Sequence, residues 1–83
     1  MSTATPPAPD WWARVARTAT CMRVYTGMLL DRATPSIDGA TLRLEFHAPE
    51  DAANWQASSS SRVLDAALRH HGIHATVDHM TQN

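Results

Sequence analysis

Four histidines in the last part of the chain come closest to a metal-binding pattern. They are His70, His71, His74 and His79, and the only cysteine, Cys21, is far from them in sequence. A zinc ion needs about four ligands that converge tetrahedrally, usually with cysteine among them. Gly72 is expected to end a helix between His70 and His74, which separates these side chains. We therefore predict no metal site and no cofactor, and we expect these histidines on the polar surface at a helix end.

A run of serines and the lone cysteine are the other candidates for chemistry. The four serines Ser58–Ser61 could supply a nucleophile or a phosphate loop, but such a loop needs glycines and none is near. N-capping of the next helix explains them better. Cys21 lacks a motif that would supply an orienting base, so we expect a buried small side chain. We predict no catalytic residues and a non-enzymatic protein, since no acid/base or nucleophile constellation is present.

Composition limits the class of protein further. The 83 residues fit one domain, and a hydrophobic fraction of 43% allows a core. A net charge of −1 lacks the basic footprint of non-specific nucleic-acid binding. A single cysteine permits no internal disulfide, no apolar run is long enough to cross a membrane, and the start of the chain lacks the regions of a signal peptide. We expect a cytoplasmic protein that does not contact membranes.

The elements that must position these side chains begin after a proline-containing segment. Residues 1–9 are predicted to be a flexible tail, residues 10–79 a single α+β domain, and residues 80–83 a second tail. Asp10 is the expected N-cap of a helix from Trp11 to about Thr20, with Trp12 on its core stripe and Trp11 partly exposed. A second helix from Met22 to Leu30 presents four apolar residues: Val24, Tyr25, Met28 and Leu29.

A hairpin follows these helices. Ala33–Ile37 is a weak strand that should lie at a sheet edge, because Pro35 has no backbone donor. Asp38-Gly39 forms the turn, since glycine tolerates positive φ. Thr41–Phe46 alternates strictly, and its apolar residues Leu42, Leu44 and Phe46 face one way.

Two more helices and a strand complete the pattern. We expect helices at Glu50–Ala57 and from about Arg62 to His71, and a strand at Ile73–Asp78. Gly72 is placed as the C′ residue of a Schellman motif, which would bring Leu68 against Ile73.

The predicted fold is a KH-like α+β arrangement in the order α-α-β-β-α-α-β, a three-stranded sheet with helices packed on one face. Its core should contain seven apolar residues: Leu42, Leu44, Phe46, Leu64, Leu68, Ile73 and Val77. The other face of the sheet should be open to solvent or to a partner, and it should carry Arg43, Glu45, His74, Thr76 and Asp78.

The order and spacing of several motifs resemble the small C-terminal domain of the bacterial DNA polymerase III clamp-loader subunit gamma/tau. The matching segments span about Asp10–Val77 and are Trp12-x-x-Val15, Met28-Leu29-Leu30, Ile37-Asp38-Gly39-x-x-Leu42-x-Leu44-x-Phe46, Asn54-Trp55-Gln56-Ala57-Ser58-Ser59 and Val63-Leu64-x-x-Ala67-Leu68. The chain departs from gamma/tau in having no Gly-Lys-Ser/Thr phosphate loop. The resemblance implies a module that docks another protein of the replication machinery.

The chain is also similar in layout to the N-terminal domain of the initiator DnaA. Ala48-Pro49 precedes a helix containing Trp55, as in that family. The initiator family commonly has a bulky apolar residue early in this helix for contact with the helicase, whereas this chain has Ala52 and Ala53.

The leading functional hypothesis is a protein–protein interaction module that docks a polymerase or helicase subunit of the replisome. A KH-like nucleic-acid-binding domain is the alternative, but it would require a Gly-x-x-Gly loop, which the sequence lacks. Trp11, Trp55 and Arg62 are the predicted partner-binding residues, because Trp and Arg most often dominate binding energy. Trp55 could instead be the core anchor of its helix. The sequence makes no prediction of oligomeric state.

Overall fold

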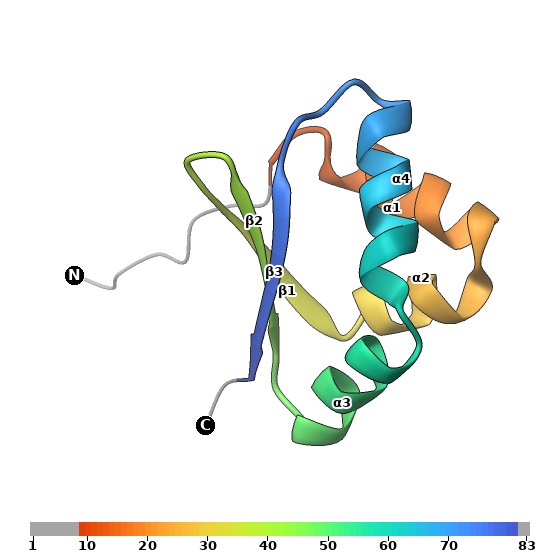
Figure 1. Ribbon diagram of the computed structural model, residues 1–83, viewed down its shortest axis with the longest axis vertical. Helices are drawn as coiled ribbons and strands as arrows, with labels where there is room; N and C mark the ends of the chain where they lie inside the picture. Colours follow the sequence, from red (N-terminus) through yellow and green to blue (C-terminus); the bar gives the residue numbers. More distant parts are fainter. Residues whose placement is uncertain (1–8, 82–83) are drawn as a thin grey trace.

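The computed structural model describes residues 9–81, which form an α+β domain with four helices and a three-stranded sheet (Figure 1). The elements are α1 (Trp12–Met22), α2 (Val24–Leu30), β1 (Ala33–Asp38), β2 (Thr41–Phe46), α3 (Pro49–Ala57), α4 (Ser60–His70) and β3 (Thr76–Thr81). This order confirms the predicted α-α-β-β-α-α-β arrangement. The predicted tail at 1–9 lies outside the described residues except for Pro9, and so do positions 82 and 83.

The sheet has the order β1-β2-β3, so that β2 is central and both other strands are edges. β1 and β2 form an antiparallel hairpin around Gly39, whose φ is 61°. β3 returns parallel to β2 and pairs Val77 with Leu42. All four helices lie on one side of the sheet (Figure 1), as predicted from the one-sided alternation of β2.

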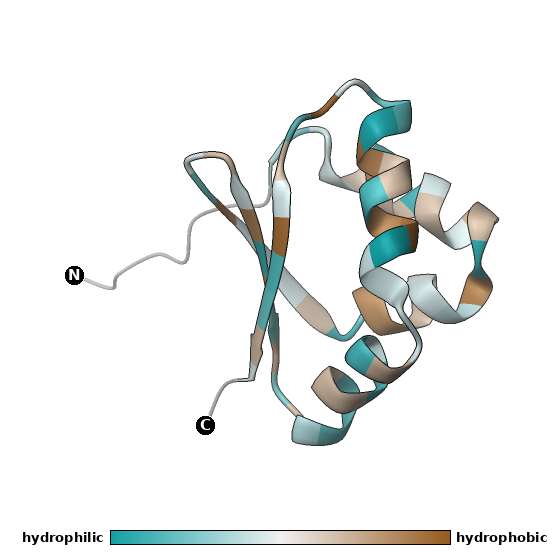
Figure 2. Cartoon of the chain, in the orientation of Figure 1, coloured by the Kyte–Doolittle hydropathy of each residue, from teal (hydrophilic) through white to brown (hydrophobic). Residues whose placement is uncertain are grey.

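The core lies between that side of the sheet and the helices (Figure 2). Leu42, Leu44 and Phe46 are fully buried, and Leu64 and Leu68 of α4 pack over them, as predicted. The other buried apolar residues are Val15, Ala19, Leu29, Leu30, Ala52, Trp55 and Ala67. The core therefore draws on every helix.

Ile73 and Val77 were predicted to be core residues, but they are only half-buried and pack against the rim of the core. Val77 lies on the edge strand β3, which has a neighbour on one side only, and Ile73 lies in the connection before that strand. Trp12 is likewise half-buried rather than fully buried. It is the first residue of α1, whereas the buried stripe of that helix is centred on Val15 and Ala19.

The end of α4 is the Schellman motif that the sequence predicts. The Ile73 N–H donates to the Leu68 carbonyl at 2.9 Å, and the Gly72 N–H donates to the Arg69 carbonyl at 3.0 Å. Gly72 has a φ of 70°, which a side chain would make costly. Gly72 and Ile73 are used to close this motif, and the chain reaches the sheet only after them. β3 therefore begins at Thr76 rather than Ile73. It then continues through Thr81, so residues 80 and 81 belong to the domain and not to a tail.

The helix starts differ from prediction in their caps. α1 has Trp11 at its N-cap position and no side-chain cap, so Asp10 does not cap it. α2 begins at Val24 because Arg23 is extended, with a φ of −158°, which turns the chain between α1 and α2. The two helices are closely apposed at this turn, since a methyl group on Gly27 would overlap the Thr20 side chain.

Leu44→Ala is expected to lower the free energy of unfolding by about 2–5 kcal/mol, because it leaves a cavity under the helices. Urea denaturation of the variant and of Glu45→Ala, its neighbour on the other face of β2, measures the difference. Glu45→Ala should change stability by no more than about 0.5 kcal/mol. Melting of Leu44→Ala like the wild type would contradict this placement of β2.

Candidate functional site

The three predicted partner-binding residues do not form one surface. Trp11 is half-buried at the start of α1 and packs against the core, and Arg62 is exposed on α4. Trp55 is only 1% exposed, and its ring centroid lies 5.7 Å from that of Phe46. A side chain this deeply buried cannot dock a partner, so the assignment of Trp55 is wrong. It is the core anchor of α3, because that helix has no other large apolar residue.

The largest group of exposed apolar side chains lies elsewhere, where α1 turns into α2. Val24 is 67% exposed, Met28 54%, Met22 52% and Tyr25 41%. We call these four residues the apolar corner. Of the four apolar residues that the second helix was predicted to present, only Leu29 enters the core. Their grouping on adjoining turns makes this region a candidate interaction site.

The orientation of α2 explains the apolar corner. Its inward side is formed by Thr26, Gly27, Leu29 and Leu30. A seven-residue helix cannot bury apolar residues all round its circumference, so the remaining ones face solvent. The sequence signal of the corner is an excess of apolar residues over one helical face, which does not tell which of them stay outside the core.

A shallow hollow of about 230 Å³ adjoins the corner between α2 and α3. Tyr25 and Met28 form one wall of it, and Glu50 and Asn54 of α3 lie opposite. At its edge, Arg32 and Asp51 form an ion pair at 3.7 Å. An apolar centre beside a charged rim is the usual anatomy of a protein–protein interface.

A buried hydroxyl cluster fixes α2 against the α3–α4 junction. The Thr26 hydroxyl donates to Ser60 Oγ at 3.0 Å, and the Ser58 and Ser60 hydroxyls lie 2.6 Å apart. Thr26 and Ser60 have no exposed surface. The Arg23 guanidinium donates to the Ser58 carbonyl from the chain segment that carries the corner.

The N-capping role predicted for the serines is therefore wrong. Ser59 occupies the N-cap position of α4 but makes no side-chain cap hydrogen bond, and its φ of 55° is left-handed. Ser58 and Ser60 instead satisfy each other and Thr26 inside the domain. The signal was hidden because Thr26, the distant partner, is 34 residues away from Ser60.

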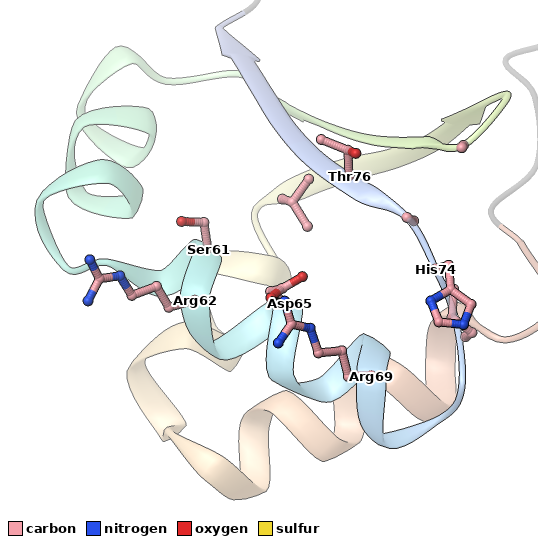
Figure 3. Close-up of a pocket in the computed structure, with 10 residues that line it drawn as sticks. Ser61, Arg62, Asp65, Arg69, His74 and Thr76 are labelled. Atoms are coloured by element: carbon pink, nitrogen blue, oxygen red, sulfur yellow. Dashed lines mark ion pairs between the residues drawn. The ribbon is translucent and has the colours of Figure 1, made fainter.

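Arg62 lies beside a groove between α4 and the edge strand β3 (Figure 3). The groove has a volume of about 620 Å³. Four residues of α4 line one side of it: Ser61, Arg62, Asp65 and Arg69. The other side is lined by Thr76 and Val77 of β3, by Ile73, His74 and Ala75 just before that strand, and by Ala40 between β1 and β2. Asp65 and Arg69 are ion-paired at 3.2 Å.

His70 and His71 are exposed at the end of α4. The His71 ring contacts the Thr18 hydroxyl at 2.7 Å and stacks edge-on with His70. Within residues 9–81, no three His, Cys, Asp or Glu side chains are grouped so as to hold a metal ion.

Cys21 is exposed, which corrects its predicted burial, because it lies on the outward side of α1. None of the described helices has the length and apolar character needed to cross a membrane.

The open face of the sheet is acidic. The strand register places Asp38, Glu45 and Asp78 on this face with a single arginine, Arg43. Arg43 and Asp78 are 3.9 Å apart across β2 and β3. Three carboxylates against one guanidinium disfavour a nucleic-acid backbone on this face.

Comparison of the chain with protein-family models, with curated proteins and with solved structures gave no match.

Ser60→Ala should lower the free energy of unfolding by about 1–3 kcal/mol, because it leaves the buried Thr26 hydroxyl without its acceptor. Adding Thr26→Val replaces the hydroxyl that has lost its acceptor with a methyl group, with little change of shape. The double variant should therefore be less destabilised than the sum of the two single variants. Chemical denaturation of all four proteins completes the cycle, and strict additivity would show that the two hydroxyls do not interact.

Proposed function

We propose that the protein is a non-enzymatic protein–protein interaction module that docks a component of the bacterial replisome, a polymerase or helicase subunit, through the apolar corner. The single observation that carries docking is the exposure of Met22, Val24, Tyr25 and Met28 on adjoining turns. Burying these side chains against a partner would remove apolar surface from water, which is the main driving force of association. The choice of a replisome partner rests on the sequence resemblance to gamma/tau.

The surroundings of the apolar corner support this proposal. Two of its four residues are methionines, whose flexible thioether side chains adapt to a partner surface. Tyr25 adds a rigid aromatic ring with a polar end, a residue type enriched at interfaces. Glu50 makes no ion pair in the described part of the chain and would suit a basic group of the partner.

Trp11 and Arg62 lie outside the apolar corner. Trp11 is at the start of α1, whereas the corner begins at the end of that helix with Met22. Trp11 also packs against the core, so Trp11→Ala would remove core contacts as well as any contact with a partner. The corner residues offer a cleaner test.

Val24→Asp is expected to weaken partner binding at least about tenfold, because a carboxylate would be desolvated against an apolar surface. Its matched control is Met80→Asp, which introduces the same charge at another exposed apolar residue, on the open face of the sheet. The full chain and both variants are titrated calorimetrically with purified polymerase and helicase subunits, after thermal melting confirms folding. Single-stranded DNA and RNA at two salt concentrations form a further arm.

The proposal predicts that one of the replisome subunits binds, that Val24→Asp loses this binding and that Met80→Asp keeps it. Absence of binding to every subunit, or equal binding by Val24→Asp and the wild type, would refute it. Tight, salt-sensitive binding of the oligonucleotides in place of protein would favour the nucleic-acid-binding alternative. Self-association that is abolished by Val24→Asp would assign the corner to a second copy of the chain instead.

A further inference from the structure

The edge of β3 and the adjoining groove have features that the apolar corner does not use. β3 pairs with β2 on one side only. Successive residues of a parallel strand direct their backbone groups to opposite sides. The Thr76 N–H donates to the Ala40 carbonyl at 2.8 Å, toward β2. The N–H and carbonyl groups of Val77 and His79 therefore point away from the sheet, at the open edge.

The two edges of the sheet are not equivalent. On β1, the register places Pro35 opposite Leu44, whose backbone groups point toward β3. Pro35 therefore occupies a position where the strand would otherwise offer an outward donor, and it interrupts the row. β3 contains no proline. The edge at β3 is thus the one that can accept another strand.

The charged side chains that line the groove favour an added strand with acidic residues. Arg62 makes no ion pair within residues 9–81, and Arg69 is shared with Asp65. Both arginines line the groove from α4. In Figure 3, Arg69 lies beside Asp65, whereas the Arg62 side chain extends outward from the start of α4. Two guanidinium groups against one carboxylate leave an excess of positive charge. Ile73 and Val77, both half-buried, add an apolar floor.

The open face beside this edge carries the opposite charge. Asp78 and Glu45 lie there against a single arginine, Arg43, which leaves an excess of negative charge. An added strand would present alternate side chains to the groove and to this acidic face. Carboxylates would be favoured on the groove side and disfavoured on the other. A nucleic-acid backbone is negatively charged at every phosphate, so it cannot direct its charges to the groove side alone.

We propose that the groove between α4 and β3 binds an extended protein segment with acidic residues at alternate positions, which adds to the sheet as a fourth strand beside β3. Backbone hydrogen bonds to Val77 and His79 would supply affinity, and Arg62 and Arg69 would select carboxylates. The His79 N–H now donates to the Asp78 carboxylate at 2.9 Å, which keeps the edge occupied until a strand replaces this contact. The proposal does not depend on the apolar corner.

Two pairs of variants separate the backbone contribution from the charge contribution. Val77→Pro removes one outward N–H without touching the ladder to β2, and Val77→Ala keeps the N–H while trimming the side chain. Arg62→Glu reverses a charge in the groove. Arg17→Glu makes the same change at an exposed position of α1 that does not line the groove.

The experiment screens the full chain against an array of immobilised ten-residue peptides. The array holds peptides with glutamate or aspartate at alternate positions, peptides of the same composition with the acids in one block, and versions with lysine in place of the acids. The strongest alternating peptide is then measured in solution by fluorescence anisotropy, with oligothymidylate as a competitor. Thermal melting checks the folding of every variant.

Alternating acidic peptides should bind best. Val77→Pro should weaken binding about tenfold while Val77→Ala stays within about threefold. Arg62→Glu should weaken it roughly fivefold and Arg17→Glu by less than about twofold. Val24→Asp should leave peptide binding unchanged, which separates this site from the apolar corner. Should Val77→Pro fail to fold, the two arginine variants decide.

The proposal is overturned if lysine peptides bind as well as acidic ones, or if no acidic peptide of the array binds. It is equally overturned if Val77→Pro binds like Val77→Ala, or if oligothymidylate displaces the peptide and binds more tightly.

Discussion

The apolar side of β2 is the constraint on which the rest of the structure depends. Leu42, Leu44 and Phe46 have no exposed surface, and each must be covered from the same side because the strand alternates. Covering them draws Leu64 and Leu68 of α4 and Trp55 of α3 over the sheet. All the described helices lie on this side, so none of them covers the other face of the sheet. The one-sided fold follows from this single strand.

The surfaces proposed for binding follow from the same constraint. Helix α2 reaches the core with one side only, and its other apolar residues remain at the apolar corner. β3 pairs with β2 on one side and has no strand on its other side, which makes it an edge with unpaired backbone groups. The buried hydroxyls of Thr26 and Ser60 then hold α2 in the orientation that displays Val24 and Met28. Both candidate surfaces are thus by-products of covering β2 with few residues, and both are placed on rigid elements.

Local patterns were sufficient to predict much of the fold. The alternation of Thr41–Phe46, the Asp38-Gly39 turn and the Gly72 cap each depend on a few neighbouring residues, and all three lie where the sequence places them. The candidate site was harder, because it depends on which helical faces the sheet covers. Periodicity does not reveal that Trp55 fills the core while Val24 is left outside. The role of Ser58 and Ser60 depends on Thr26, a tertiary contact that no local rule contains.

The most direct test of this account is amide hydrogen exchange of the full chain, measured alone and with each replisome subunit. The account predicts that a bound subunit slows exchange in residues 22–30, which contain the apolar corner, and leaves the amides of β2 unchanged because they are already protected by the sheet. Slowed exchange confined to the hairpin of β1 and β2, with none in residues 22–30, would contradict the claim that the corner is the docking surface.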